Sequence, residues 1–317
     1  MNPTLVVAIL AVAIIATVFL IAYICFKLTF YVKECDKKPR EEFPIPDGEI
    51  YKPWRETMIG WMKSTRALKY EAFSIKAFDG VTLQGKYYEH TPGAPIELMF
   101  HGYRGHAERD LCGGVQRCYA LGHNAFIVDQ RACGDSEGNV ITFGVNEYKD
   151  CLSWINFAVN HFNKDTQFLL TGISMGASTV LNAAGTDLPD NVVGVLADCG
   201  FTSPAEIIKK VICDMKLPPN ITYWFIRLGA RVYGHFDLDE IASIDAVKRC
   251  KLPVLFFHGE SDDFVPCDMS QKMYDACSSK KRLVIVPGAG HGLSFPVDPE
   301  LYLQEMAEFF HNGEILS

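Results

Sequence analysis

The sequence lacks a basic stripe. Its 317 residues carry 30 Lys and Arg against 38 Asp and Glu, for a net charge of −8. Domains that bind nucleic acid gather Lys and Arg on one face, so this composition predicts no nucleic-acid binding. The 11 cysteines include no C-x-x-C pair and no spacing typical of zinc ligands. We therefore expect no metal site, and the odd number of cysteines favours a reducing compartment over a disulfide framework.

Charge is also absent from residues 5–26, which are rich in Val, Ile, Leu and Ala. About 20 such residues span a bilayer as a helix. A buried core helix would show a polar face, which this segment lacks. A cleaved signal peptide normally has positive charge before its apolar stretch, whereas residues 1–4 have no charged side chain. We therefore expect residues 1–33 to form an uncleaved, single-pass transmembrane anchor.

The charges beside this segment are unevenly distributed. Five basic residues follow it and none precedes it; they are Lys27, Lys33, Lys37, Lys38 and Arg40. Basic residues favour the cytoplasmic side of a membrane. The globular part is therefore expected to be cytoplasmic, in agreement with the reducing compartment that the cysteines favour.

The rest of the chain divides into a short connecting segment and one large domain. Residues 34–69 start with charged residues and several prolines, which is typical of a linker, and end in a predicted short helix that docks on the domain. From residue 70 onward, strand and helix patterns alternate. The predicted strands cover residues 72–78, 81–88, 96–100, 125–129, 168–170, 192–197, 253–258 and 283–286. This order predicts an α/β domain over residues 70–317, with one mostly parallel, eight-stranded sheet covered by helices on both faces.

One segment interrupts the alternation. About fifty residues, approximately 203–250, connect the predicted strands 192–197 and 253–258, although a crossover of about a dozen residues would be long enough. They contain an apolar run that includes Tyr223, Trp224 and Phe225. Insertions at this end of an open sheet can cover a binding site. We expect a lid or cap whose three aromatic residues contact the substrate; the alternative is a helical excursion that only packs on the surface.

A serine between glycines marks the candidate nucleophile. Residues 172–176 read Gly-Ile-Ser-Met-Gly and lie between a predicted strand and a predicted helix. This is the pattern of a nucleophile elbow, a turn so tight that only glycine fits two residues on either side of the serine. The turn would hold Oγ of Ser174 above the start of a helix, where N–H groups favour negative charge.

A serine becomes a strong nucleophile when a histidine takes its proton and a carboxylate orients that histidine. In elbow hydrolases the three follow in the order Ser, Asp or Glu, His. His291 lies in a glycine-rich loop after the last predicted strand and is the candidate base. Asp262 and Asp263 compete for the acid role, and the spacing G-x-x-D-x-x-V over 259–265 favours Asp262. Asp198, after an earlier strand, is a third candidate that we interpret as structural.

Two further positions complete the candidate site. An oxyanion needs two N–H donors held in place. The backbone N–H of Met175 is one candidate. The backbone N–H of Tyr103, in the loop after an earlier strand, is the other, with its phenol as a weaker additional donor. His101 and His258 lie at strand ends beside glycines, and we expect them to stabilise turns.

Five motifs in this order resemble those of a known superfamily. They are HGYRGH at 101–106, DQRACGDSEG at 129–138, GISMG at 172–176, HGESDDFVP at 258–266 and GAGHG at 288–292. The chain is similar to α/β hydrolases, in particular to membrane-anchored bacterial serine hydrolases near the prolyl-oligopeptidase and bile-acid acyltransferase branch. The resemblance implies an α/β-hydrolase fold, preceded here by one transmembrane helix. It also implies a triad of Ser174, Asp262 and His291, and structural roles for Arg131 and Ser136.

The function expected from these residues is hydrolysis of an acyl ester through an acyl-enzyme intermediate, as in carboxylesterases and lipases. This chemistry requires no metal or organic cofactor. The predicted anchor and apolar insertion suggest a small or lipid-like acyl substrate. A peptidase or thioesterase with the same triad is the alternative, because a triad does not separate these reactions. A catalytically silent, membrane-anchored binding protein is a distant alternative, since all three triad positions are filled.

Overall fold

A sheet of eight strands lies at the centre of the domain, in the spatial order β1-β2-β4-β3-β5-β6-β7-β8. The structure is a computed structural model and describes residues 2–37, 41–311 and 316. The strands are β1 (Glu71–Lys76), β2 (Thr82–Tyr88), β3 (Ile96–Phe100), β4 (Asn124–Asp129), β5 (Phe168–Ile173), β6 (Val192–Asp198), β7 (Val254–Gly259) and β8 (Lys281–Val286). Strand β2 is antiparallel to both of its neighbours, and all other neighbouring strands are parallel. The predicted fold class is confirmed, and every strand ends within about three residues of its predicted bounds.

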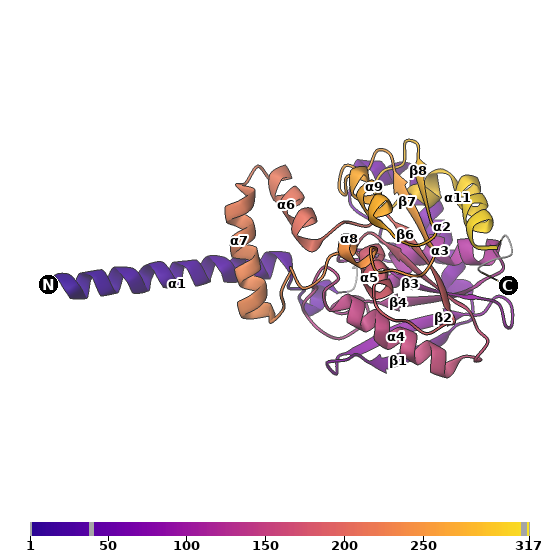
Figure 1. Cartoon of the computed structure of the whole chain (residues 1–317), viewed down its shortest axis with the longest axis horizontal. Coiled ribbons are helices and arrows are strands. Elements are labelled where there is room, and N and C mark those ends of the chain that lie inside the picture. The colour runs from indigo at the N-terminus through magenta and orange to yellow at the C-terminus, as the bar shows by residue number, and fades with distance from the viewer. Residues whose placement is uncertain (1, 38–40, 312–315, 317) are drawn as a thin grey trace.

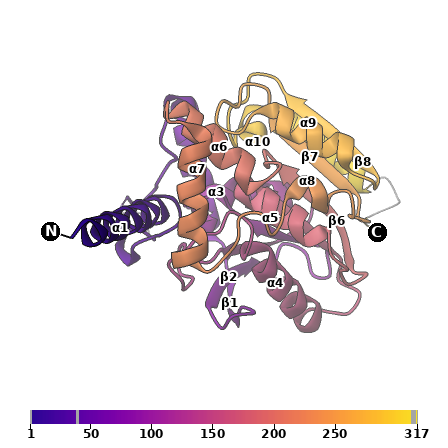
Figure 2. The same cartoon turned by 60° about the vertical axis from the view of Figure 1, so that its left-hand side comes forward.

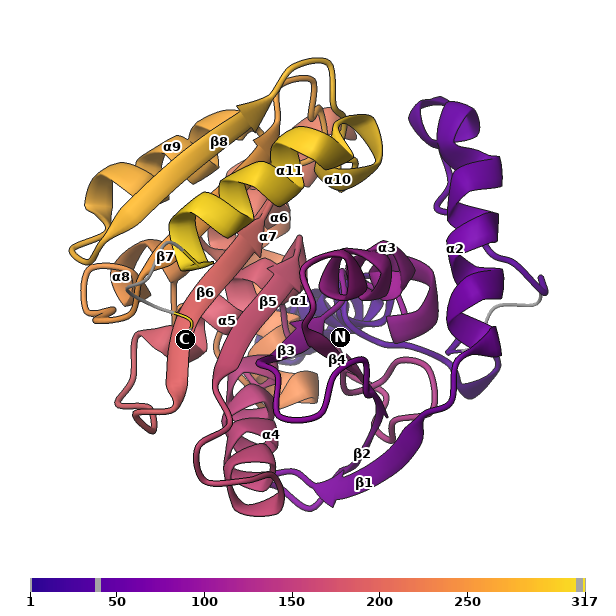
Figure 3. The same cartoon turned by 90° about the vertical axis from the view of Figure 1, so that its right-hand side faces the viewer.

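Helices cover both faces of this sheet (Figure 3). One face carries α4 (Glu147–His161), α5 (Met175–Ala184), α8 (Ser243–Ala246) and α9 (Cys267–Ala276). The other carries α2 (Arg55–Ala67), α3 (Ala107–Ala120), α10 (Ser294–Val297), α11 (Pro299–Met306) and the π-helical turn η4 (Ala307–His311). Alternate strand residues serve the two cores: Leu170 packs toward α5, and Leu169 packs toward α11. The strands are therefore apolar on both sides, as buried parallel strands are.

A long helix, α1 (Pro3–Thr29), projects from the domain (Figure 1). It is long and apolar enough to cross a membrane, a property that membrane anchors and signal sequences share. Its last turns are built into the domain, where Phe26 and Phe30 are buried in one core cluster. Two of the basic residues counted for orientation, Lys38 and Arg40, lie outside the described residues.

The segment expected as a linker is folded onto the domain. It forms two short 3₁₀ turns, η1 (Glu34–Asp36) and η2 (Glu49–Trp54), and then α2. Helix α2 packs against α3, and the ring of Trp61 lies 5.4 Å from that of Phe295. Most of this segment therefore covers the domain and does not act as a free spacer.

The insertion after β6 consists of helices. It contains α6 (Pro204–Asp214), α7 (Pro219–Gly229), the π-helical turn η3 (Ala230–Gly234) and α8. Helices α6 and α7 stand away from the sheet, and α7 lies across α1 (Figures 1 and 2). The close crossing depends on Gly229, because a Cβ there would lie 2.4 Å from the carbonyl oxygen of Ala22.

One buried charge cluster ties the sheet to α3. Glu97 of β3 is fully buried and is ion-paired with Arg117; its other oxygen lies 2.8 Å from Nδ1 of His123. Burial opposes the ionisation of Glu97, but Arg117 and His123 outweigh it and lower the pKa of Glu97 to about 2. The carboxylate is therefore ionised in the folded protein, and removing its charge leaves a buried guanidinium without a counter-charge.

We expect Glu97→Gln to lower the free energy of unfolding by about 3 kcal/mol, because breaking one side of a buried ion pair leaves the other charge unpaired. Urea denaturation of the full chain in detergent measures this. Glu71→Gln, at an exposed position of β1, is the matched control and should change it by less than about 0.5 kcal/mol.

The pH dependence of this effect follows from the sign of the pKa shift. The pKa of Glu97 is lowered on folding, so its contribution is fully present above the ordinary value of 4.5 and is lost as pH falls toward 2. The difference between wild type and Glu97→Gln should shrink over that window. If the difference in free energy of unfolding between wild type and Glu97→Gln stays constant between about pH 6 and about pH 3, this account is contradicted.

Candidate active site

The elbow between β5 and α5 is as tight as its glycines suggest. Ser174 has φ 56° and ψ −119°, a strained conformation for a residue with a Cβ. A Cβ at Gly172 would lie 2.2 Å from the backbone of Gly176. A Cβ at Gly176 would lie 2.0 Å from the carbonyl oxygen of Phe100. No larger residue fits at either position without moving the backbone.

Three predicted residues lie in one hydrogen-bonded chain. Nε2 of His291 lies 3.0 Å from Oγ of Ser174, and Nδ1 of His291 lies 2.7 Å from Oδ2 of Asp262. The carboxylate of Asp262 can accept a hydrogen bond from Nδ1 only if Nδ1 carries the proton of the neutral ring. Nε2 is then unprotonated and can accept a hydrogen bond from the hydroxyl of Ser174. The arrangement has the order nucleophile, base and orienting carboxylate.

The carboxylate is held from several directions. Oδ1 of Asp262 accepts from the backbone N–H groups of Phe264 and Val265, at 3.0 and 2.8 Å. Nε2 of the buried His258 lies 3.3 Å from Oδ2. Burial opposes the ionisation of Asp262, but His258 and His291 lower the pKa of this carboxyl to about 2. Asp262 is therefore a charged acceptor at neutral pH.

His258 does more than the sequence predicted for it. Its Nε2 contacts the carbonyl oxygen of Val265 at 2.9 Å, as a turn-stabilising residue would, and its Nδ1 contacts Oγ of Ser270 at 2.7 Å. The contact with Asp262 was missed. The sequence did contain a signal for this contact: His258 lies near the end of the strand that precedes Asp262, four residues before it.

The two rival carboxylates lie elsewhere. Asp263 is exposed, and its backbone carbonyl accepts from Lys210 of α6. Asp198 accepts from Ser294 at 2.9 Å and from Tyr302 at 3.2 Å, and burial raises its pKa. Among the described residues, only Asp262 places a carboxylate on His291.

The loop after β3 is fixed beside the serine. Nε2 of His101 accepts from the backbone N–H of Gln130 at 2.9 Å, so this histidine holds the loop as predicted. The N–H of Gly102 donates to Asp110 at 3.2 Å. No described residue accepts from the N–H of Tyr103, and Met175 is the first residue of α5, whose N–H has no partner within the helix. Both candidate oxyanion donors are thus available.

The phenol of Tyr103 is not available. It donates to the carbonyl oxygen of Thr29, at the end of α1, over 2.6 Å. The suggestion that this hydroxyl adds an oxyanion donor is therefore wrong, because the hydroxyl points to α1 and has a partner there.

A cavity of about 520 Å³ opens at Ser174 and His291. Its walls include apolar side chains from three parts of the chain; these are Ile50, Met58, Ile173 and Phe264. Residues 46–51 also line it, and the hydroxyl of Tyr51 donates to the carbonyl oxygen of His291 at 3.0 Å. The supposed linker thus supplies a wall of the candidate binding site.

The three aromatic residues predicted to contact substrate do not line this cavity. Tyr223 is buried in the helical insertion and its hydroxyl lies 3.2 Å from Asp239. Trp224 is exposed on the outside of α7, and Phe225 packs beside it, with ring centroids 4.9 Å apart. The reason is that the inner face of α7 is occupied by α1 and α6, so it does not face the site.

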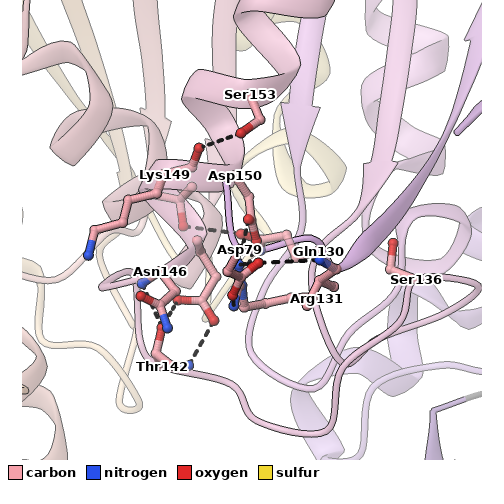
Figure 4. A network of polar contacts seen from close by, with 12 residues as sticks. Asp79, Gln130, Arg131, Ser136, Thr142, Asn146, Lys149, Asp150 and Ser153 are labelled. Carbon is pink, nitrogen blue, oxygen red and sulfur yellow. Dashed lines mark hydrogen bonds and ion pairs between the residues drawn. The ribbon is translucent and has the colours of Figure 1, made fainter. Parts of the chain in front are cut away.

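The residues predicted to shape the neighbouring loop do so (Figure 4). Arg131 donates two hydrogen bonds of 2.6 Å to Asp150 and two, of 2.9 and 3.4 Å, to Asp79. Oγ of Ser136 donates to the carbonyl oxygen of Asp129 at 2.6 Å. Figure 4 shows Arg131 between the β1–β2 turn and the start of α4, where it braces both.

One group of possible metal ligands coincides with the triad. A ligand atom from each of Cys199, Asp262 and His291 lies within 4.8 Å of the other two. The atoms of Asp262 and His291 are already joined by the hydrogen bond described above, and burial raises the pKa of the Cys199 thiol well above its usual value. A thiolate is therefore disfavoured there, and the geometry fits the triad better than a metal centre.

Comparison with known proteins agrees with this geometry. The family model for prolyl oligopeptidases (Peptidase_S9) matches residues 142–313. Protein YfhR of Escherichia coli is 26% identical over 303 residues, which cover 91% of this chain and 93% of that protein. Protein bem46 of Schizosaccharomyces pombe is 25% identical, with 78% of this chain and 79% of that protein covered. YqkD of Bacillus subtilis is 27% identical over 61% of this chain, and the match spans 63% of its own length.

Solved structures show the same fold. A Pyrococcus furiosus esterase superposes with a TM-score of 0.65 at 19% identity, over 86% of this chain and 97% of its own. Est1E of Butyrivibrio proteoclasticus, solved with ferulic acid bound, superposes with a TM-score of 0.59 at 21% identity. The match covers 75% of this chain and 97% of Est1E. These likenesses establish an α/β-hydrolase fold for the chain.

We expect Asp262→Asn to lower kcat by about 10⁴-fold, because the amide does not hold the required tautomer of His291. Asp263→Asn is the matched control, one residue away and exposed, and should change kcat by less than about threefold. Steady-state hydrolysis of a chromogenic short-chain ester measures both. A larger loss in Asp263→Asn than in Asp262→Asn would reverse the assignment.

Proposed function

The chain belongs to the prolyl oligopeptidase family, and from this premise we propose that it is a serine hydrolase that cleaves acyl esters. The observation that carries the proposal is the chain of hydrogen bonds from Ser174 through His291 to Asp262, whose first two members line a cavity. The hydrolase class follows from family and fold. The ester substrate is inferred from the apolar walls of the cavity.

The mechanism follows from the positions of these groups. Oγ of Ser174 attacks the acyl carbon while Nε2 of His291 takes its proton, and Asp262 stabilises the resulting imidazolium. The carbonyl oxygen gains negative charge beside the N–H groups of Met175 and Tyr103. The tetrahedral intermediate then expels the alcohol, which takes the proton from His291, and the acyl group stays on Ser174.

Water completes the cycle by the same route. His291 removes a proton from a water molecule, whose oxygen attacks the acyl carbon. Collapse of the second tetrahedral intermediate breaks the bond to Oγ, and Ser174 recovers its proton from His291. The acid product leaves, and no metal or organic cofactor takes part in these steps.

A peptidase is the second candidate. The family match favours it, and the cavity wall formed by residues 46–51 carries Asp47 and Glu49. Carboxylates at such a position can hold the charged amino terminus of a peptide. We prefer the ester substrate because the apolar side chains of Ile50, Met58, Ile173 and Phe264 line the same cavity as Ser174. A thioesterase uses the same attack and differs only in the leaving group.

We further propose that α1 is retained as a membrane anchor. Ala22 is buried, and Phe26 and Phe30 belong to a core cluster, so cleavage after α1 would expose apolar surface of the domain. The basic residues after α1 favour a cytoplasmic domain.

A fluorophosphonate probe should label the wild-type protein and not Ser174→Ala, because the probe reacts with the activated hydroxyl. Ser74→Ala, at an exposed position of β1, is the control and should label like wild type. Gel fluorescence of the labelled chain measures this. Labelling of Ser174→Ala, or no labelling of the folded wild type, would refute the assignment.

The substrate class is tested by a panel of esters of increasing acyl length, with the matching thioesters and aminoacyl amides. We expect kcat/KM to be higher for esters than for amides with the same acyl group and to rise with acyl length, because the apolar walls bind methylene groups. Preference for amides with a free amino terminus would favour the peptidase.

A further inference from the structure

Helix α7 is apolar on nearly all sides. Arg227 is its only charged residue. Tyr223, Ile226 and Gly229 are buried on its inner face, toward α1 and α6. A surface helix of a soluble domain turns a polar face to water, so the outer face of α7 needs an explanation.

That outer face carries an exposed apolar stripe. Ile221 and Trp224 are 63% and 52% exposed, and their spacing of three residues on α7 places them on one side of the helix. Leu217, in the turn just before α7, is 43% exposed. Met215, at the end of α6, is 63% exposed and extends the stripe around the α6–α7 turn. We refer to these four residues as the α7 stripe. Several large apolar side chains exposed on one helix and the turn before it mark an interaction site.

The position of α1 indicates what covers the stripe. Residues 3–21 of α1 are almost entirely exposed and, at 1.5 Å per residue, extend about 28 Å, close to the thickness of a bilayer core. Helix α7 crosses α1 where this exposed run ends, because Gly229 lies on the carbonyl of Ala22. In Figures 1 and 2, α7 runs crosswise to α1, with α6 between it and the sheet. With α1 across a membrane, α7 lies along the membrane surface.

We propose that the α7 stripe is a second membrane-binding element, seated in the lipid–water interface beside α1. An apolar helix face in the plane of the interface is a known mode of membrane binding, and tryptophan favours that depth. The proposal rests on the function proposed above and on α1 as anchor, and it names the substrate class as acyl esters resident in the membrane.

The same contacts place the active site at the membrane. Helix α6 follows the end of β6, and its Lys210 donates to the carbonyl of Asp263 at the cavity rim. The phenol of Tyr103, in the cavity wall, bonds to Thr29 at the end of α1. The anchor α1 and the helical insertion thus lie on the side of the domain where the parallel strands have their carboxyl ends and where Ser174 lies. Two membrane contacts restrict rotation about α1 and keep this edge toward the lipid.

Quenching by brominated lipid tests the position of the stripe. The full-length protein is placed in nanodiscs that hold one chain each, made of phosphatidylcholine brominated near the headgroup end of its acyl chains. Tryptophan emission should fall relative to unbrominated lipid, and Trp224→Phe should lose most of that difference. Trp54→Phe is the matched control, because Trp54 lies outside the stripe, and it should keep the difference.

The alternatives give different results. If Trp224→Phe is quenched like wild type, Trp224 is not in lipid and the proposal is wrong. A second copy of the chain would also cover the stripe, but it is absent from nanodiscs with a single chain. Protection of Trp224 that appears only when two chains share a nanodisc would assign the stripe to self-association and overturn the proposal.

Activity provides an independent readout. Leu217→Glu with Ile221→Glu should lower hydrolysis of a long-chain ester embedded in vesicles by at least about tenfold, because charge expels the stripe from the interface. Hydrolysis of a soluble short-chain ester should stay within about twofold. Phe78→Glu, at an apolar position that is 52% exposed on the β1–β2 turn, is the control and should leave both rates unchanged.

The two readouts separate this proposal from the proposed function. A wild type that hydrolyses no ester refutes the esterase, while the quenching still tests the membrane contact. A wild type that hydrolyses both esters, with a double variant that loses neither, retains the esterase and refutes the role of the stripe.

Discussion

No side chain fits at positions 172 and 176, and the rest of the site depends on that restriction. Because Gly176 touches the carbonyl oxygen of Phe100, the elbow packs directly on the last residue of β3. The loop that starts at His101 contains the candidate oxyanion donor Tyr103. One backbone contact therefore sets the distance between the nucleophile and that donor, and the strain at Ser174 is held by packing on both sides.

The end of α1 is part of the same framework. The last carbonyl groups of a helix lack partners within it and carry partial negative charge. Here the phenol of Tyr103 donates to Thr29, and the guanidinium of Arg104 donates to Leu28 and Tyr31 at 2.9 and 3.3 Å. Both donors belong to the candidate oxyanion loop. A helix that could have been a simple tether is thus joined to the loop that would stabilise the transition state.

Much of the fold and the site could be predicted from the sequence because both are encoded locally. Buried strands such as β3 and β5 read as short apolar runs, and parallel strands bring their carboxyl ends to one edge. Ser174 directly follows β5, and Asp262 and His291 lie in the loops that follow β7 and β8, so the topology brings all three to the same edge of the sheet. Asp262 was separable from Asp263 by spacing, since only one of two adjacent side chains can point inward from the turn.

What the sequence did not reveal depends on contacts between distant parts of the chain. Residues 46–51 read as linker because prolines and charges dominate locally, yet Tyr51 reaches His291 across 240 positions. Helix α7 presents a different difficulty. Its aromatic residues indicate an apolar partner without indicating which face meets it, so a lid over the cavity and a contact with lipid have the same sequence pattern. The crossing with α1 favours the proposed contact with lipid, because it fills the inner face of α7 and leaves Trp224 outside.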